Sequence, residues 1–161
     1  VIIMREEELI SLLKEKGLHI CCAESCTGGM LSSTLVNVVG ASDALDMGFV
    51  TYANEAKIKL LGVDAKTIEH YGVVSEQVAE QMAHGAAEVS GAQVAVGISG
   101  IAGPGGSEYK PEGMVCFGFY INGKTATSTK QFGALGRQNV RTLSCEYAID
   151  TLLRLLKDEK I

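Results

Sequence analysis

Ser25 lies in the segment AESCTGG, residues 23–29, directly after a short apolar run and directly before a predicted helix. A serine hydroxyl at such a junction has three uses: it caps the helix, binds a phosphate, or attacks a carbonyl carbon as a nucleophile. The neighbouring residues leave all three open. Cys26 is a further candidate nucleophile, because the start of a helix favours a thiolate.

Two more segments carry polar or glycine-rich residues where an apolar run ends. One contains Tyr52 and Lys57, and the other is SGIAGPGG, residues 99–106. Ligands gather at the carboxyl ends of strands in open α/β sheets, so we expect the three segments to form one crevice if their strands are neighbours. A lysine buried there loses its proton more readily, and a neutral Lys57 would then take the proton of Ser25.

Structural roles also fit these residues. Ser25 would serve as a turn residue, Lys57 as a solvated helix lysine, and Tyr52 as a half-buried residue at a strand end. The loop that begins at Ser99 fits either a tight turn or a nest of backbone N–H groups that binds an anion. Residue types alone do not separate these roles.

Several common catalytic motifs are absent from the sequence. It has no Walker A lysine, no G-x-G-x-x-G followed by a helix, no G-x-S-x-G and no H-E-x-x-H. The histidines, His19, His70 and His84, are scattered. We therefore expect neither a metal site nor a cofactor.

Composition excludes some classes of partner. The net charge is −5 and no basic stripe occurs, so we expect no nucleic-acid partner. No apolar run approaches the ~20 residues of a membrane span, so we expect no membrane partner either. The five cysteines include no C-x-x-C pair, which favours a reducing, cytoplasmic setting. Charged residues make up only 20%, which hints at a homo-oligomer, possibly a dimer.

Hydrophobic periodicity predicts helices and strands that alternate through most of the chain. Asn54 is expected to cap the third helix and Ser75 the fourth, and Asn122-Gly123 is expected to turn a hairpin. Such an order gives a mixed sheet with helices on both faces. We find no repeat or linker, so residues 1–161 are expected to form one domain. The predicted helices are residues 5–17, 29–39, 54–62, 74–91 and 137–157, and the predicted strands are residues 18–24, 46–55, 92–100, 114–121 and 124–132.

Four segments together resemble one known family, the CinA C-terminal domain, over nearly the whole chain. They are AESCTGG, GFVTYANEAKIKLLGV, YGVVSEQVAEQMAHGA and ISGIAGPGG, in this order. The resemblance implies a three-layer α/β/α sandwich with a mixed, mostly parallel five-stranded sheet. Characterised members are nicotinamide mononucleotide deamidases, so it also implies a metal-free amidohydrolase. The family also occurs behind an unrelated N-terminal domain, and this chain does not begin with Met.

The resemblance also implies roles for individual residues. Ser25 matches the family serine and is expected to attack the amide, Lys57 to accept its proton, and Tyr52 to orient the lysine or relay the proton. Ser99 stands where the family usually has threonine. An arginine near the start of the last helix is expected to help, with Arg141 favoured over Arg137. The expected substrate-binding residues are Cys26, Thr27, Gly28, Gly29, Ser99, Gly100, Gly103, Gly105, Arg141 and Arg137.

Three alternatives to this activity remain at the level of sequence. The first is a nucleotide-binding or regulatory module without turnover, linked to competence or DNA damage. The second is an amidase for a related amide. The third is a cysteine hydrolase that uses Cys26. In the favoured hypothesis, backbone N–H groups of residues 26–28 hold the oxyanion, and residues 100–106 with an arginine receive the phosphate and ribose.

Overall fold

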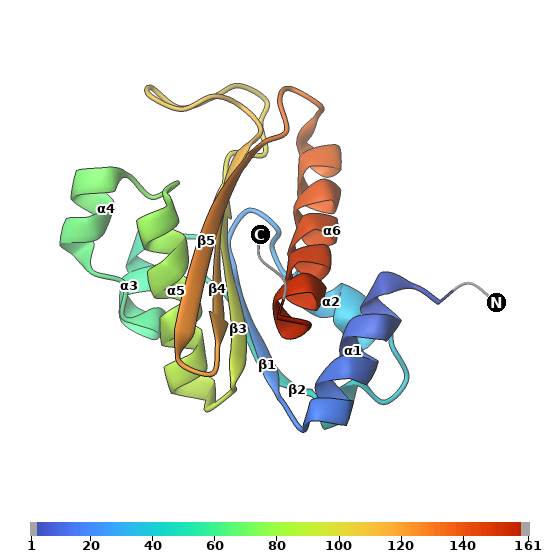
Figure 1. Cartoon of the computed structure of the whole chain (residues 1–161). Helices are drawn as coiled ribbons and strands as arrows, with labels where there is room; N and C mark the ends of the chain where they lie inside the picture. The colour runs from blue at the N-terminus through green and yellow to red at the C-terminus, as the bar shows by residue number, and fades with distance from the viewer. Residues whose placement is uncertain (1–2, 159–161) are drawn as a thin grey trace.

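A computed structural model describes residues 3–158 of the chain as five strands that form one sheet, with helices on both of its faces (Figure 1). All the strands and helices expected from the sequence are present. The elements are α1 Arg5–Lys16, β1 Ile20–Glu24, α2 Met30–Val36, η1 Ala41–Asp43, β2 Leu45–Val50, α3 Asn54–Leu61, α4 Ala65–Tyr71, α5 Glu76–Ser90, β3 Val94–Gly100, β4 Met114–Ile121, β5 Lys124–Gln131 and α6 Arg137–Leu156.

The sheet is mixed, as expected, with strand order β2-β1-β3-β4-β5. Strand β1 pairs in parallel with β2 and β3, whereas β4 is antiparallel to both β3 and β5. Strand β4 therefore runs against the other four. Helices α1, α2 and α6 cover one face, and α3, α4 and α5 cover the other (Figure 1). The layers form the expected α/β/α sandwich.

The local sequence signals were mostly correct. The hydroxyl of Ser75 accepts a hydrogen bond from the N–H of Val78 and caps α5, as expected. Asn122 and Gly123 both have positive φ, 48° and 86°, which is the backbone that a tight hairpin needs. The expected cap at Asn54 was wrong. Ala53 is the N-cap of α3, no side chain caps that helix, and Asn54 is its first residue.

Helix α4 was not predicted from the sequence. None of its residues is buried, so it has no apolar stripe to produce a helical period. Its start is marked by Asp64, whose carboxylate accepts a hydrogen bond from the N–H of Lys66. The local signals for this helix were therefore the cap at its start and Gly72 directly after its end.

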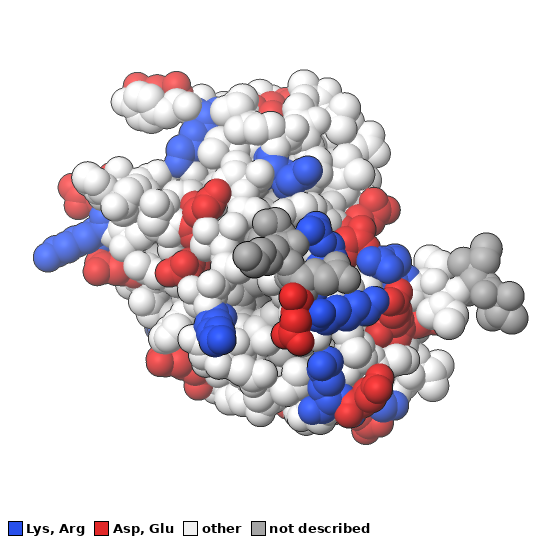
Figure 2. Space-filling model, in the orientation of Figure 1, with Lys and Arg blue, Asp and Glu red and all other residues white. Residues whose placement is uncertain are grey.

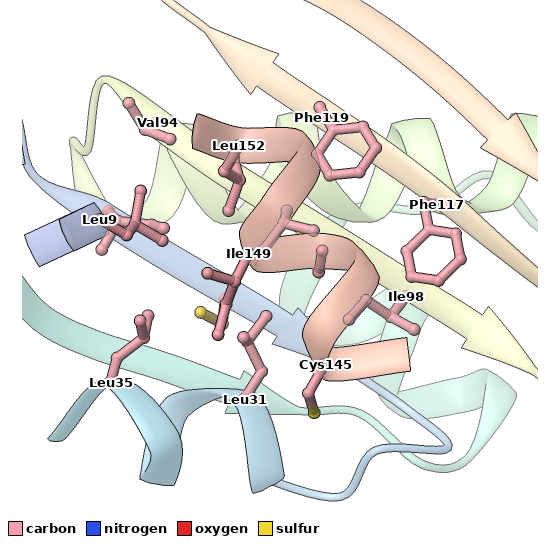
Figure 3. Close-up of a cluster of buried hydrophobic side chains, with 14 of the residues drawn as sticks. Leu9, Leu31, Leu35, Val94, Ile98, Phe117, Phe119, Cys145, Ile149 and Leu152 are labelled. Atoms are coloured by element: carbon pink, nitrogen blue, oxygen red, sulfur yellow. The ribbon is translucent and has the colours of Figure 1, made fainter. Parts of the chain in front are cut away.

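The larger core cluster lies between the sheet and the helices α1, α2 and α6. Figure 3 shows Leu9 of α1, Leu31 and Leu35 of α2, and Ile149 and Leu152 of α6 against the strands. These side chains are buried, and each fully buried aliphatic side chain stabilises the fold by about 1.5–3 kcal/mol. This packing fixes α6, which carries the two candidate arginines.

Helix α5 lies unusually close to the sheet. A Cβ atom on Gly97 of β3 would lie 2.3 Å from the carbonyl oxygen of Ala79, and one on Gly118 of β4 would lie 2.4 Å from it. Only glycine allows this approach. The short distance fixes the start of α5, and with it residues 71–75, beside the carboxyl end of β3.

Charged side chains on the face shown in Figure 2 are intermixed, with blue and red atoms side by side and no continuous basic area. Within residues 3–158, none of the helices has both the length and the apolar character to cross a membrane.

Candidate active site

The three expected segments converge at one edge of the sheet. Strands β1, β2 and β3 are parallel neighbours, and Glu24 of β1 pairs with Val50 of β2 and Ile98 of β3. The residues that follow these strand ends therefore meet. They line a cavity of about 430 Å³ whose walls are Ser25, Cys26, Tyr52, Asn54, Lys57, Arg137 and parts of residues 72–74 and 99–110.

Ser25 and Lys57 are in direct contact at the base of this cavity. The Lys57 Nζ lies 3.1 Å from Ser25 Oγ and donates to the carbonyl oxygens of Thr51 at 2.7 Å and Tyr52 at 3.3 Å. Lys57 is 1% exposed and Ser25 is 8% exposed. Within residues 3–158, no carboxylate pairs with the Lys57 ammonium. Burial lowers the pKa of Lys57, because desolvation disfavours the charged amine.

Three oxygens surround the Lys57 Nζ. As an ammonium it donates to Ser25 Oγ and to the carbonyls of Thr51 and Tyr52, one N–H group to each. As a neutral amine it keeps two N–H groups for the two carbonyls, and its lone pair can then accept the proton of the Ser25 hydroxyl. The geometry thus allows Lys57 to act as a general base toward Ser25.

Lys57 is buried because of its position on α3. It lies four residues before Leu61, on the same face of the helix, and these two are the buried residues of α3. A lysine therefore occupies a position where the pattern of the helix would place an apolar residue. Gly62, in the left-handed conformation, ends the helix one residue later.

The loop at residues 25–29 is held on both sides. Gly28 and Gly29 have positive φ, 59° and 98°, which a side chain would disfavour. The guanidinium of Arg141 donates to the carbonyl oxygens of Cys26 at 3.0 Å and Thr27 at 2.9 Å. Thr27, Gly28 and Gly29 therefore shape this loop, and they do not line the cavity.

The hydrogen bonds of this loop reduce the number of backbone N–H groups that could hold an oxyanion. The N–H of Gly28 donates to the carbonyl of Ser25 at 3.0 Å, and the N–H of Gly29 donates to Glu24 at 3.2 Å. Gly28 is therefore occupied, contrary to expectation. The candidates left from residues 26–28 are the N–H groups of Cys26 and Thr27.

The thiol of Cys26 is poorly suited to be a nucleophile. Cys26 is buried, and this burial raises its pKa to about 11. The reactive form of cysteine is the thiolate, and a thiol with this pKa is protonated at neutral pH. The geometry favours Ser25 over Cys26.

Ser99 and the glycines after it build the opposite wall. The buried hydroxyl of Ser99 donates to the carbonyl of Val73 at 2.8 Å, so it joins β3 to residues 72–74. Gly100, Gly103 and Gly105 line the cavity, as expected for a substrate-binding loop. The N–H of Gly105 donates to the carboxylate of Glu112, which fixes the loop from outside the cavity.

The structure places the two candidate arginines differently from the order of preference given by the sequence. Arg137, not Arg141, lines the cavity. Its guanidinium donates to the carbonyl of Gly103 and, at 2.9 Å, to the hydroxyl of Tyr52. Arg141 lies one helical turn further along α6 and is used by the loop at residues 25–29.

Tyr52 is placed differently from expectation. Its side chain is 63% exposed and its hydroxyl contacts Arg137, while its backbone carbonyl contacts Lys57. The hydrogen bonds within residues 3–158 include none from the Tyr52 hydroxyl to Lys57 or Ser25. This side chain is therefore at the mouth of the cavity, not beside Ser25 and Lys57.

Sequence reasoning missed two residues of the mouth, Tyr109 and Lys110. Tyr109 is 84% exposed, and the Lys110 Nζ donates to the carbonyls of Tyr71 and Val74. Besides the buried Lys57, Lys110 and Arg137 give the cavity two cationic side chains, and no Asp or Glu of the described chain lines it. The sequence signal for Lys110 was a lysine within a glycine- and proline-rich loop. Within residues 3–158, no three His, Cys, Asp or Glu side chains are grouped so as to hold a metal.

The fold and the site define a class: an α/β protein with a buried serine–lysine pair at the carboxyl edge of its sheet. The sequence model of the protein family described as CinA C-terminal domain matches residues 4–156. The chain therefore belongs to the CinA C-terminal domain family.

Curated relatives include proteins of two lengths. The chain is 48% identical to the protein named nicotinamide-nucleotide amidohydrolase PncC of Enterobacter agglomerans, and the match covers 91% of this chain and 90% of that protein. It is 45% identical to a CinA-like protein of Kosmotoga olearia, covering 94% of this chain but 37% of that protein. The chain thus spans little more than a third of the longer relatives.

Solved structures share the whole fold. A competence/damage inducible protein of Agrobacterium tumefaciens superposes with a TM-score of 0.89 at 40% identity, and the match covers 96% of this chain and 98% of that one. A CinA superfamily protein of Escherichia coli gives a TM-score of 0.91 at 38% identity, covering 94% of this chain and 88% of that one.

Proposed function

We propose that this protein is an amidohydrolase that converts nicotinamide mononucleotide and water to nicotinate mononucleotide and ammonia. The observation that carries the proposal is the 3.1 Å contact between Ser25 Oγ and Lys57 Nζ, inside a cavity. The substrate is suggested by the relative named nicotinamide-nucleotide amidohydrolase, which matches at 48% identity over 90% of its length.

In the first half of the reaction, Ser25 Oγ attacks the carboxamide carbon and its proton passes to the neutral amine of Lys57. The carbonyl oxygen becomes an oxyanion, held by the N–H groups of Cys26 and Thr27 in the loop that follows Ser25. When the tetrahedral intermediate collapses, the C–N bond breaks and Lys57 gives the proton to the leaving nitrogen. Ammonia departs and the nicotinoyl group is left as an ester on Ser25.

In the second half, water replaces ammonia beside Lys57. Lys57 takes a proton from this water as its oxygen attacks the ester carbon. The bond to Ser25 Oγ then breaks, and Lys57 returns the proton to Ser25. Oxyanion donors of this kind typically contribute about 3–4 kcal/mol each.

The rest of the cavity suits an anionic nucleotide. Arg137 and Lys110 line it, and no carboxylate of the described chain does. Both cations donate to backbone carbonyls, and Arg137 also donates to the Tyr52 hydroxyl. A phosphate offers charged acceptors that bind a guanidinium more strongly than neutral oxygens do. We assign the phosphate to Arg137, with Lys110 and residues 103–105 beside it.

The test is ammonia release from nicotinamide mononucleotide, with wild type and Ser25→Ala compared and EDTA present. We expect wild type to release ammonia and nicotinate mononucleotide in equal amounts, identified by mass spectrometry, and Ser25→Ala to release neither. Binding of the nucleotide without release by wild type would contradict the proposal and favour a non-catalytic nucleotide-binding module. Loss of activity with EDTA would contradict the metal-free mechanism.

Location and assembly are also part of the proposal. All five cysteines are free, which suits the reducing cytoplasm. A homo-oligomer, a dimer in the simplest case, is supported by apolar side chains exposed on α2, the turn after it and the edge strand β2: Val36, Val39, Met47 and Val50. Val39 is 98% exposed. Sedimentation velocity of wild type and Val39→Asp tests this, because the aspartate would weaken an apolar interface.

A further inference from the structure

Glu24 is a buried carboxylate that the proposed mechanism does not use. It ends β1, directly before Ser25, and it is 0% exposed. Its Oε1 accepts hydrogen bonds from the N–H groups of Gly29 at 3.2 Å and Leu31 at 2.9 Å. Its Oε2 accepts from the N–H of Ser32 at 2.9 Å and the hydroxyl of Ser32 at 2.7 Å. Each carboxylate oxygen thus binds two donors.

These contacts replace a missing cap. The N-cap of α2 is Gly29, which has no side chain to bind the free N–H groups of the first turn. The Glu24 carboxylate reaches over the loop to bind them, and a carboxylate is favoured at this end of a helix. The loop that carries Ser25 is therefore closed into a ring, with Glu24 joined to Ser25 by the chain and to α2 by hydrogen bonds.

The other side of the same loop is held by Arg141. Glu24 binds N–H groups at its far end, whereas Arg141 binds the carbonyls of Cys26 and Thr27 in its middle. Within the loop, Gly28 and Gly29 have left-handed backbones, and the N–H of Gly28 donates to the carbonyl of Ser25 at 3.0 Å. The side chains of Glu24 and Arg141 add four further contacts that tie this loop to α2 and α6.

We propose that Glu24 is a positioning residue: by tying its own end of β1 to the first turn of α2, it keeps Ser25 Oγ in contact with Lys57 Nζ. This inference rests on the proposed function in one respect, that Ser25 is the nucleophile. Glu24 does not line the cavity, and both its oxygens are occupied by α2 and Gly29. Its effect on the reaction passes through the backbone of the loop.

The test uses Glu24→Gln and, as a graded control, Ser32→Ala. Glutamine has the same size, but its NH2 group must face either the N–H of Ser32 or the N–H groups of Gly29 and Leu31, so donors face each other in both orientations. Ser32→Ala removes one of the four hydrogen bonds and leaves the carboxylate in place. Folding is checked for both by circular dichroism and thermal unfolding, and rates are given per folded molecule.

We expect kcat for Glu24→Gln to fall by about 100-fold, the effect of a misplaced reacting group, with little change in KM. For Ser32→Ala we expect a fall of several-fold. The shape of the pH profile is expected to stay that of wild type, because Lys57 remains the titrating group. An unchanged kcat in folded Glu24→Gln would overturn the proposal. So would a shifted pH profile, since Glu24 would then act through its charge. If Glu24→Gln does not fold, the outcome rests on Ser32→Ala, and an unchanged kcat there would overturn the proposal.

A second readout separates this inference from the choice of substrate. Phenylmethylsulfonyl fluoride sulfonylates activated serines and loses fluoride, and mass spectrometry of peptides locates the label. We expect wild type to be labelled on Ser25 and Glu24→Gln to be labelled much more slowly. If wild type is labelled but does not hydrolyse nicotinamide mononucleotide, the proposed substrate is wrong, and the labelling rates alone decide the role of Glu24. If wild type neither turns over nor is labelled, Ser25 is not a nucleophile and the positioning role is overturned.

Discussion

The base and the mouth of the cavity are built differently. At the base, Ser25 and Lys57 are buried, and Lys57 is hydrogen-bonded to Ser25 and to a backbone carbonyl. At the mouth, Tyr52 and Tyr109 are 63% and 84% exposed, and Arg137 is exposed as well. The difference indicates that the reacting groups are in place before substrate arrives, whereas the mouth must exchange protein contacts for substrate contacts. Variants at the base should therefore lower kcat, and variants at the mouth should raise KM.

Among variants at the floor of the cavity, Lys57→Arg is expected to lower kcat the most. An arginine keeps a positive charge, does not deprotonate in proteins, and is too large for this buried position. Because general-base catalysis contributes about 100- to 10,000-fold, we expect kcat to fall by at least ~1,000-fold. Steady-state ammonia release measures this, with thermal unfolding as the control. A variant that keeps a tenth of the wild-type kcat would show that Lys57 is not the base.

The pH dependence of kcat/KM tests the protonation state of Lys57 at the base of the cavity. The reaction needs neutral Lys57, whose pKa burial lowers from 10.5. Below that lowered pKa the neutral fraction falls, so kcat/KM should drop about tenfold for each pH unit. Above the lowered pKa, kcat/KM should reach a plateau, and this plateau should begin at a pH below 10.5. We would measure kcat/KM across this range. A profile that declines as pH rises would contradict a neutral lysine base.

Arg137→Met tests whether the mouth of the cavity binds the phosphate of the substrate. Methionine keeps most of the volume and removes the charge. Since hydrogen bonds to charged groups contribute about 1.5–3 kcal/mol, KM should rise by roughly 10- to 100-fold with kcat little changed. Nicotinamide riboside, which lacks the phosphate, provides the control: its KM should be almost equal in wild type and variant. An equal loss with both substrates would show that Arg137 does not bind the phosphate.

Tyr52→Phe should have a smaller effect. It removes the hydroxyl that contacts Arg137 and keeps the backbone carbonyl that accepts from Lys57. We expect KM to rise several-fold and kcat to stay within about twofold, because neutral hydrogen bonds contribute only ~1 kcal/mol. If kcat falls instead, the hydroxyl takes part in proton transfer, as the sequence alone first suggested.

Cys26→Ala should have the smallest effect on rate. The thiol is protonated at neutral pH because burial raises its pKa to about 11, and the backbone N–H of residue 26 is kept. We expect kcat/KM to stay within about threefold of wild type. Loss of acylation in this variant would restore the cysteine hydrolase as the better hypothesis.

The residues at the base of the cavity could largely be predicted, because they directly follow strands that the sequence pattern reveals. Parallel strands end at one edge of a sheet, so the polar residues after β1, β2 and β3 had to meet. The burial of Lys57 was not predicted in the same way: the sequence left a solvated lysine open, and the structure shows that Lys57 and Leu61 form the buried face of α3. The family resemblance added the roles of these residues.

The mouth could not be predicted to the same depth. Arg137 and Arg141 are four residues apart on one face of α6, and local pattern does not say which of them reaches the cavity. The answer depends on where residues 25–29 and 103 lie. Lys110 has its partners at Tyr71 and Val74, a contact between distant parts of the chain. Glu24 was visible as part of a motif, but its contacts depend on the curvature of the loop.

The cationic lining of the cavity has a consequence for what happens after the reaction. In the proposed conversion the neutral carboxamide becomes a carboxylate, so the product carries one more negative charge than the substrate. Lys110 and Arg137 line the cavity that would hold this product, and no acidic side chain of the described chain lines it to repel the product. Attraction that helps the substrate to enter must therefore slow the product's departure. Nicotinate mononucleotide should be a competitive inhibitor that binds more tightly than the substrate, and its release should limit turnover when it accumulates.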